Sequence, residues 1–536
     1  MITDQRSRRF VWWTGAVLGL LAFVWLFPGL DDVGVSWDEP HYFNSVERIQ
    51  EWFAHVVAGP DRSQLFSQET VRETFDWGRY FNPHPPAYKL AMAATEAAFG
   101  RWTGEIVGYR LAPLGFFSLL VACVTWMAGM AWGRAAGVGA GLSILLMPRV
   151  VGHAHIGATD TLTTLAWFVA CTGLVLYALG GKRRFLAIGS VGLGLALATK
   201  FTGYLIPVAM LLWMIAYGRS RRFVAGAILW GLCGLLVAWA INPLMWHDPV
   251  AETLLLVRDS LEREQVVPIT TFYLGRVWGY QVPGHHAIVM TLITVPISIL
   301  ALSGWGAAVT TRRWEERPVG GLCLTQILFF VFLMSAPGSP NHDGVRLWLP
   351  MFPFVALLAG RGFGSMIRVV RQRIPRQQAI LASLFLGAVF FLPPYVQTVR
   401  VAPLYLAYYN EAIGGVRGAA RAGMETTYWL EAITPAFLER VNETLPQGAS
   451  LSPWPNVTHL KWLQTHGMLR RDIVVTKELP ADYLLLVARK ATFRSHHWRI
   501  YENVRPELAV ELDGVEIVGL YAWEQNEVFE PDPEDP

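Results

Sequence analysis

Long apolar runs separated by short polar segments occupy this chain from its start to about residue 397. An apolar run of about twenty residues is long enough to cross a bilayer as a helix. The 185–217 region fits either two short spans that turn near Lys200 or one long span with a break. With two spans there, the pattern predicts about eleven, near residues 10–30, 107–131, 136–152, 157–180, 185–199, 201–217, 222–242, 286–308, 320–336, 346–364 and 378–396.

Basic residues between the spans predict their orientation. The segments "GKRRF" (181–185) and "GRSRRF" (218–223) are both basic, and basic loops of membrane proteins remain in the cytoplasm. Two loops on one side require two spans between them, which favours the two-span interpretation. The same rule places "TRRWEER" (311–317) and "IRVVRQRIPR" (367–376) inside. We therefore expect a multi-pass protein of the inner (plasma) membrane, with its N-terminus in the cytoplasm and its C-terminus outside.

The polar segments predict the domain organisation. The membrane domain is expected to include two large external loops, of which the first contains two amphipathic patterns ("YFNSVERIQEWFAHVV" and "AYKLAMAATEAAFG") typical of helices on a membrane surface. The predicted units are a membrane domain (1–397) with external loops at 31–106 and 243–285, a connecting segment (398–428), an external α/β domain (429–525) and a disordered acidic tail (526–536). In the α/β domain we expect a helix near 430–444, strands near 473–475 and 483–488, and a hairpin over 508–524 that turns at Asp513-Gly514.

Composition supports a membrane protein and excludes some other classes. Hydrophobic residues make up 53% of the chain and charged residues 16%, too few charges to cover a soluble domain of this size. The net charge of +3 and the absence of a basic tract with interleaved aromatics give no reason to expect nucleic acid as a partner. The cysteines lie inside apolar runs without metal-ligand spacing, and we interpret them as small core residues: Cys123, Cys171, Cys233 and Cys323.

The stretch "VSWDEPHYF" (35–43) follows the first span and places two acids, Asp38 and Glu39, close to Tyr42 at the outer membrane surface. One interpretation is a solvated loop that ends the helix. The other is a catalytic site, in which one ionised carboxylate takes a proton from an acceptor hydroxyl. From this stretch alone, both interpretations stay open.

A second polar motif, "RYFNPHPPAYKL" (79–90), lies in the same external loop. Two successive prolines force extended backbone and then favour the start of a helix, which places Asn82 and His84 at a helix entrance and Lys89 in its first turns. A helix N-terminus beside a lysine is a favourable anion site. A capped surface helix with an ordinary lysine would produce the same pattern.

The third motif, "PRVVGHAHIGATDTL" (148–162), forms a short external turn that contains His153, His155 and Asp160. Two histidines and an aspartate could hold a divalent metal. However, a His-x-His pair in extended backbone directs its rings to opposite faces, so this spacing is a weak metal signal. A metal site that also includes Glu39 therefore stays open.

Three cations, Arg110, Lys200 and Arg346, lie at membrane depth near the outer ends of spans. Charges in such positions are costly and usually face a cavity or a partner. Their expected convergence with carboxylates suggests a site for an anionic lipid head group. A phosphate carrying a sugar is already a good leaving group when cations balance its charge, so the remaining requirement is one base. Asp38 fits that role.

These motifs, together with "ATKFTGYLIP", "RLWLPMFPFVALLAGRG" and "APLYLAYYNEAIGGVRGA", resemble the protein O-mannosyltransferases of glycosyltransferase family 39. The lipid A aminoarabinose transferases, which share the GT-C membrane architecture, are similar too. The resemblance implies a GT-C fold in which Asp38 is the catalytic base. It places Glu39 beside the donor phosphate or a metal, and His84 and Lys89 close to the donor. Because 243–285 is too short for the β-trefoil module of the eukaryotic members, a bacterial or archaeal member with another acceptor is favoured.

The function expected from the sequence is therefore transfer of a sugar from a polyprenyl-phosphate donor to a hydroxyl of an external protein, lipid or glycan. No cofactor is required if cations balance the phosphate, although a divalent metal stays open. A polytopic transporter or flippase of lipid-linked or small anionic substrates is the alternative. That alternative predicts mid-span charges and internal repeats, whereas the charges here lie at outer ends and no repeat is evident.

Overall fold

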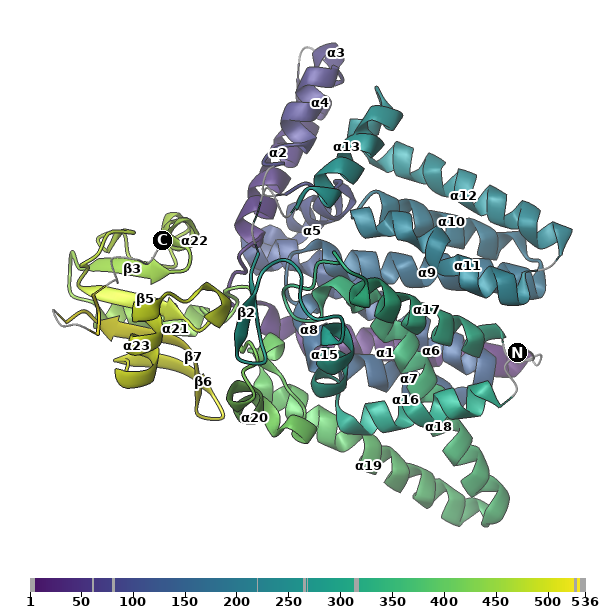
Figure 1. Ribbon diagram of the computed structural model, residues 1–536. Coiled ribbons are helices and arrows are strands. Elements are labelled where there is room, and N and C mark those ends of the chain that lie inside the picture. The colour runs from purple at the N-terminus through teal and green to yellow at the C-terminus, as the bar shows by residue number, and fades with distance from the viewer. Residues whose placement is uncertain are drawn as a thin grey trace.

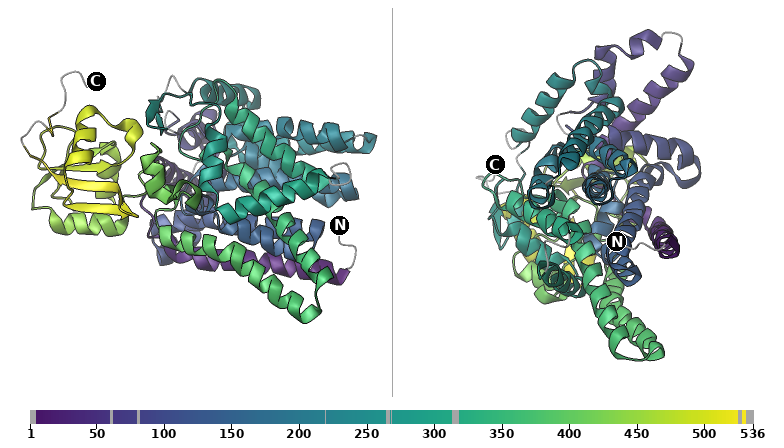
Figure 2. Two further views of the ribbon diagram at one scale, coloured as in Figure 1. Left: turned by 60° about the horizontal axis from the view of Figure 1, so that its bottom comes forward. Right: turned by 90° about the vertical axis from the view of Figure 1, so that its right-hand side faces the viewer.

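The computed structural model describes residues 5–59, 62–79, 82–218, 220–263, 267, 269–312, 318–524 and 528–530. A bundle of long helices carries a small α/β domain, built from the last part of the chain, at one end (Figures 1 and 2). The start of α1 (Gln5–Leu26) lies at the opposite end of the bundle from this domain (Figure 1).

Within the described ranges, seven helices are long and apolar enough to cross a membrane. One of them, 346–373, is the centre of the bundle, because 94% of its apolar stretch is buried, against 17% for the last span. The seven are α1 (Gln5–Leu26), α6 (Glu105–Trp132), α9 (Thr159–Gly180), α12 (Arg221–Ile241), α17 (Pro318–Ser335), α18 (Phe352–Arg373), which follows the 3-10 turn η5 (Arg346–Met351), and α19 (Arg376–Val401).

The other predicted spans are bent or short. The helices α7 (Arg134–Leu145) and α8 (Pro148–Ala154) meet at 70°, and α15 (His286–Thr294) and α16 (Ile297–Thr311) meet at 116°. A proline lies at each bend, Pro148 and Pro296, where it removes a backbone donor. Counting each bent pair once gives up to nine spans in the described part of the chain.

The 185–217 region consists of two helices shorter than a full span, α10 (Arg183–Leu197) and α11 (Ile206–Tyr217). They are separated by an extended residue, Lys200, and by the 3-10 turn η2 (Phe201–Leu205). The predicted turn near Lys200 is therefore present. Helices of 15 and 12 residues extend only about 18–23 Å at 1.5 Å per residue, less than the hydrocarbon thickness.

The two external loops contact each other beside the bundle. The first contains α2 (Glu39–Ala58) and α5 (Ala87–Thr103), which cover the two amphipathic patterns, and the short helices α3 (Arg62–Leu65) and α4 (Gln68–Phe75). The second contains the turn η3 (Pro243–Met245), α13 (Pro249–Leu261) and the antiparallel pair β1 (Thr271–Tyr273) and β2 (Arg276–Trp278). Arg79 donates to Asp259 at 2.7 Å, which joins the first loop to α13.

The connecting segment pairs with the start of the first loop. It contains η6 (Tyr405–Ala407), η7 (Glu411–Ile413) and α20 (Gly415–Arg421), and it is followed by an irregular stretch of turns and bends, residues 422–434, which makes this pairing. The amides of Gly34 and Trp37 donate to the carbonyls of Glu431 and Trp429 at 2.9 and 2.6 Å. A Cβ at position 34 would collide with the carbonyl of Ile433, so this close pairing requires glycine.

The α/β domain contains a five-stranded sheet of order β4-β3-β5-β7-β6, in which β3 is parallel to β4 and β5, and β7 is antiparallel to β5 and β6. The predicted hairpin is confirmed, because Asp513 and Gly514 both have positive φ between β6 and β7. The elements are α21 (Pro435–Thr444), β3 (Ser450–Trp454), α22 (Val457–Thr465), β4 (Val474–Val475), β5 (Tyr483–Val487), the turn η8 (Lys490–Thr492), α23 (Ser495–Asn503), β6 (Leu508–Leu512) and β7 (Val515–Ala522).

The predicted disordered tail, 526–536, lies outside the described residues except for 528–530. Phe529 is fully buried and its ring lies 5.1 Å from that of Trp523. This part of the tail therefore packs on the α/β domain, because its aromatic side chain completes a small apolar cluster there.

Candidate functional site

A cavity of about 350 Å³ lies where the bundle meets the α/β domain. Both external loops, the break after α10, the loop before η5 and the α/β domain contribute to its wall. The charged side chains and histidines of the wall are Asp38, His41, His84, Lys200, Arg263, His342, Asp343, Arg346 and Arg489. The cavity therefore collects cations from parts of the chain that are far apart in sequence.

Asp38 faces this cavity from the residue that precedes α2. It occupies the N-cap position, but its backbone has helical dihedral angles and its side chain makes no capping hydrogen bond. The carboxylate is therefore available to other partners, and it accepts from the Arg346 guanidinium at 3.0 Å and from the Tyr42 hydroxyl at 3.3 Å. Its side chain is 25% exposed, so a substrate can reach it.

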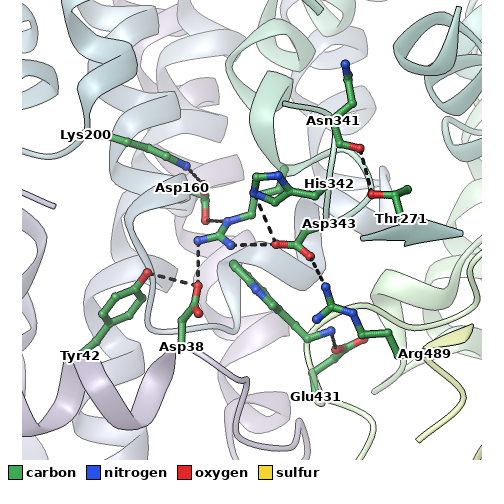
Figure 3. A network of polar contacts seen from close by, with 12 residues as sticks. Asp38, Tyr42, Asp160, Lys200, Thr271, Asn341, His342, Asp343, Glu431 and Arg489 are labelled. Carbon is green, nitrogen blue, oxygen red and sulfur yellow. Dashed lines mark hydrogen bonds and ion pairs between the residues drawn. The ribbon is translucent and has the colours of Figure 1, made fainter. Parts of the chain in front are cut away.

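A chain of alternating charges extends from Asp38 across the cavity (Figure 3). Asp160, in the first turn of α9, accepts from the Lys200 ammonium at 2.7 Å and from Arg346 at 3.1 Å. Arg346 also donates to Asp343 at 3.1 Å, and its guanidinium lies 3.8 Å from the centre of the Trp429 ring. The predicted convergence of Lys200 and Arg346 with carboxylates is therefore present in the structure.

The His-Pro-Pro motif supplies another part of the wall. The amide of Ala87, just after the prolines, donates to the carbonyl of Ala198 at 2.9 Å and so fixes this loop beside the break that carries Lys200. His84 lines the cavity. Burial and the positive charges of Lys200 and Arg346 hold the pKa of His84 well below its usual range. The imidazole is therefore neutral near pH 7 and can exchange hydrogen bonds with a ligand.

Two of the predicted donor-site residues, Glu39 and Arg110, form a buried ion pair instead. Both are fully buried, and Arg110 donates to both carboxylate oxygens of Glu39 at 2.8 Å. Glu39 also accepts from the amides of Ser36 and Gly157 at 2.7 Å. Arg110 donates in addition to three carbonyls of the first loop, those of Leu30, Val33 and Gly34.

The Glu39–Arg110 pair connects the first loop to α6 and does not line the cavity. Its charges are satisfied within the protein, as a buried ion pair requires. The structure therefore differs from the expectation that Glu39 and Arg110 would face a donor phosphate or a metal. Their role here is to hold the backbone from which Asp38 projects.

Asn82 and Lys89 are also buried next to the cavity and not in its wall. Asn82 accepts from the Tyr88 hydroxyl at 2.9 Å and donates to Ser45 at 3.4 Å, which joins α5 to α2. Burial lowers the pKa of Lys89 to about 7, and the nearby charge of Asp76 opposes this effect. A direct contact of either residue with a ligand is therefore not visible in this arrangement.

The two histidines of the third motif are separated from each other. The His153 ring packs edge-on against Trp429 at 5.6 Å. His155 lies 2.8 Å from the carbonyl of Val151 and stacks on Tyr405 at 5.0 Å. Within the described residues, no three His, Cys, Asp or Glu side chains are arranged to hold a metal ion. The candidate ligands Glu39, His153, His155 and Asp160 are accordingly not gathered into one site.

Sequence reasoning missed Asp343, Arg489 and Trp429. Asp343 has φ of 55°, in a tight turn before η5, and it lies between Arg346 and Arg489, with the Arg489 guanidinium 3.3 Å away (Figure 3). The spacing of three residues from Asp343 to Arg346 was an available signal. The contact with Arg489 spans 146 residues, and no local pattern predicts such a contact.

The arrangement defines a multi-pass membrane protein with a helical bundle and a small α/β domain. The archaeal oligosaccharyltransferase AglB from Archaeoglobus fulgidus, in complex with an inhibitory peptide and a dolichol-phosphate, has a similar fold, with a TM-score of 0.50 and 10% identity over 91% of this chain and 71% of that chain. ArnT from Cupriavidus metallidurans bound to undecaprenyl phosphate gives a TM-score of 0.48 and 14% identity, and its apo state 0.47 and 15%, each over 94% of this chain and 97% of that chain.

The family comparison is more specific. Residues 83–247 match the family described as dolichyl-phosphate-mannose-protein mannosyltransferase. This match covers about a third of the chain and agrees with the resemblance to membrane glycosyltransferases that the motifs predict. No protein of curated function matches the chain significantly.

Proposed function

We propose that this protein is a membrane glycosyltransferase that moves a sugar from a polyprenyl-phosphate donor to a hydroxyl of an acceptor outside the cytoplasm. One observation carries the proposal. A partly exposed carboxylate, Asp38, shares a single ion network with two cations, Lys200 and Arg346, in the wall of a cavity. The family match and the dolichol-phosphate bound by AglB support a lipid phosphate as part of the donor.

The proposed step breaks the bond between the anomeric carbon of the sugar and the phosphate oxygen, and forms a bond from that carbon to the acceptor oxygen. The acceptor proton moves to Asp38. The bonding electrons leave with the polyprenyl phosphate, whose growing negative charge is stabilised by Lys200 and Arg346. Because two cations already face the leaving group, we write the step without a metal, and we expect activity to persist in EDTA.

We place the cavity on the periplasmic or outer side of the membrane. Asp160, in the first turn of α9, binds the cavity residues Lys200 and Arg346, whereas the basic segment 182–184 follows the end of the same helix. A helix of 22 residues is about 33 Å long, so the site and the basic segment lie on opposite surfaces of the membrane. Basic loops stay in the cytoplasm, and this supports an acceptor outside it.

The proposal is tested with membranes that contain the full chain and a panel of polyprenyl-phosphate sugars. We expect transfer from at least one donor, and an Asp38→Asn variant that inserts normally but loses about 10²–10⁴-fold in rate, the usual contribution of a general base. Asp32→Asn, an exposed acid of the same loop, is the matched control. Full activity of Asp38→Asn would remove Asp38 from the mechanism. Movement of a lipid-linked donor across the membrane without transfer would favour a flippase.

A further inference from the structure

The α/β domain contributes directly to the cavity. Arg489 and Thr492, at the two ends of the turn η8, both line it. The Arg489 side chain is only 11% exposed, and its guanidinium lies 5.4 Å from the centre of the Trp37 ring. A long cationic side chain directed into a membrane-domain cavity is more than a surface contact between two domains.

The turn that carries Arg489 is fixed by the membrane-side part of the chain. The buried carboxylate of Glu425, in the connecting segment, accepts from the amides of Lys490 and Ala491 at 2.7 and 3.0 Å. The Thr270 hydroxyl, in the second external loop, donates to the carbonyl of Ala491 at 2.8 Å. These three hydrogen bonds come from outside the α/β domain and hold the backbone of η8, so the main-chain position from which Arg489 projects is fixed.

Arg489 and Arg346 bind the same carboxylate, that of Asp343, and this shared contact indicates the effect of Arg489 on the site. Asp343 is bound by Arg346 at 3.1 Å and by Arg489 at 3.3 Å, with its side chain 7% exposed. Arg346 donates in addition to Asp38 and Asp160. The Arg346 guanidinium therefore binds three carboxylates. Because Arg489 also binds Asp343, the attraction of Asp343 for Arg346 is weaker than it would be without Arg489.

We propose that the α/β domain completes the active site, with Arg489 as a positioning residue. By binding Asp343, it leaves Arg346 directed at Asp38 and available to the donor phosphate. Without Arg489, Asp343 draws the Arg346 guanidinium away from Asp38 and from the donor phosphate. This inference rests on the proposed function for its catalytic part, but its effect on phosphate binding does not depend on turnover.

The test is a double-mutant cycle on the full-length protein in nanodiscs, with Arg489→Ala, Asp343→Asn and the double variant. For each we measure the dissociation constant of a polyprenyl monophosphate without sugar, and kcat and KM for the donor and acceptor that the panel identifies. We expect Arg489→Ala to weaken lipid phosphate binding and to lower kcat by about tenfold, a coupling usual for neighbouring charges. In the Asp343→Asn background the same replacement has little further effect, and Arg489→Lys restores part of the loss.

Two control variants separate positioning from simple docking of the domain. Arg400→Ala removes an exposed ion pair with Asp513, another contact between the α/β domain and the last span, and Arg505→Ala removes an exposed arginine of the same domain. Both keep wild-type binding and turnover. An equal loss in Arg400→Ala, or fully additive effects of Arg489 and Asp343, overturns the proposal. If the wild type transfers no sugar, the proposed function fails, while the binding cycle still decides the role of Arg489.

Discussion

At the scale of single residues, the adjacent acids Asp38 and Glu39 have opposite surroundings. The helix α2 begins between them, so that one side chain faces the cavity and the other faces the protein interior. Asp38 has two side-chain partners and partial exposure, whereas Glu39 has a bidentate arginine, two amides and no exposure. These surroundings leave the Asp38 carboxylate accessible to a ligand and enclose the Glu39 carboxylate in the protein interior.

Replacing Glu39 therefore affects stability first. In Glu39→Gln the buried charge of Arg110 loses its counter-ion, and breaking such a pair costs about 3–5 kcal/mol. We expect a clear fall in the melting temperature of the detergent-purified protein. Glu51→Gln, an exposed acid of the same helix, is the control. A Glu39→Gln variant with normal stability and no turnover would instead give Glu39 the chemical role that the family resemblance implies.

A second residue-scale prediction concerns His459 in α22. Burial lowers its pKa to about 4, and neither ring nitrogen has a hydrogen-bond partner within the described residues. In the unfolded chain this imidazole takes up a proton near pH 6.5, whereas in the folded chain it does so only near pH 4. The free energy of unfolding is therefore highest above pH 6.5, and His459 lowers it by up to about 3 kcal/mol as the pH falls.

Melting temperatures measured between pH 7 and 4.5 test this effect. His459→Leu removes the titrating group, and we expect its melting temperature to fall less steeply with acid than that of the wild type. His466→Leu, which replaces an exposed histidine at the end of the same helix, should keep the wild-type slope. Equal slopes in all three proteins would contradict the prediction.

At the scale of elements, the site depends on how closely α9 and α10 pack. Asp160 lies at the start of α9 and Lys200 follows the end of α10, so the two helices bring this ion pair together. Their contact is made by Gly173 and Gly189, and a Cβ on Gly173 would lie 2.5 Å from the Cα of Gly189. Small residues that let two helix backbones approach are typical of membrane bundles.

Gly173→Leu is therefore expected to force α9 and α10 apart. Overpacking of this kind costs about 1–3 kcal/mol, and the displaced helices should weaken polyprenyl monophosphate binding by separating Asp160 from Lys200. Gly180→Leu is a matched control in the same helix, because a Cβ there meets nothing within 4 Å. Unchanged melting temperature and lipid binding in Gly173→Leu would show that this crossing does not position the site.

The same scale shows how far the sequence could predict the structure. Apolar periodicity places a helix at each predicted span, and Asp513-Gly514 predicts the hairpin, because both signals are local. The 116° bend after α15 was missed, since an apolar run does not reveal its direction. The strand β3 was missed as well, because "SLSPW" combines serine and proline with few strand-forming residues.

In the site, the predicted membrane topology led us to expect that Lys200 and Arg346 would converge with carboxylates. The sequence could not predict that Glu39 and Arg110 bind each other in the interior, because this depends on the direction of each side chain in the folded protein.

At the scale of the whole molecule, the two ends of the bundle have different chemistry. The α/β domain and the charged cavity occupy one end, and the exposed basic end of α18 and the start of α1 lie toward the other (Figure 1). The positive-inside rule then gives one orientation in the membrane.

Cysteine labelling of intact cells tests this orientation. A membrane-impermeant maleimide should label Asn503→Cys, in the α/β domain, directly, and Gln372→Cys, at the end of α18, only after permeabilisation; both positions are exposed. The wild type is the control, because its four free cysteines are buried or half-buried. The reverse labelling pattern would place the site in the cytoplasm.

The pairing of residues 34–37 with residues 429–431 has a consequence for biosynthesis. The loop that carries Asp38 leaves the ribosome well before its backbone partners, which are made almost 400 residues later. At a synthesis rate of about 5–20 residues per second, tens of seconds separate the two. Asp38 therefore reaches its final position only after the last span has been made, so the ion network that it shares with Arg346 stays incomplete in a nascent chain that lacks residues 429–431.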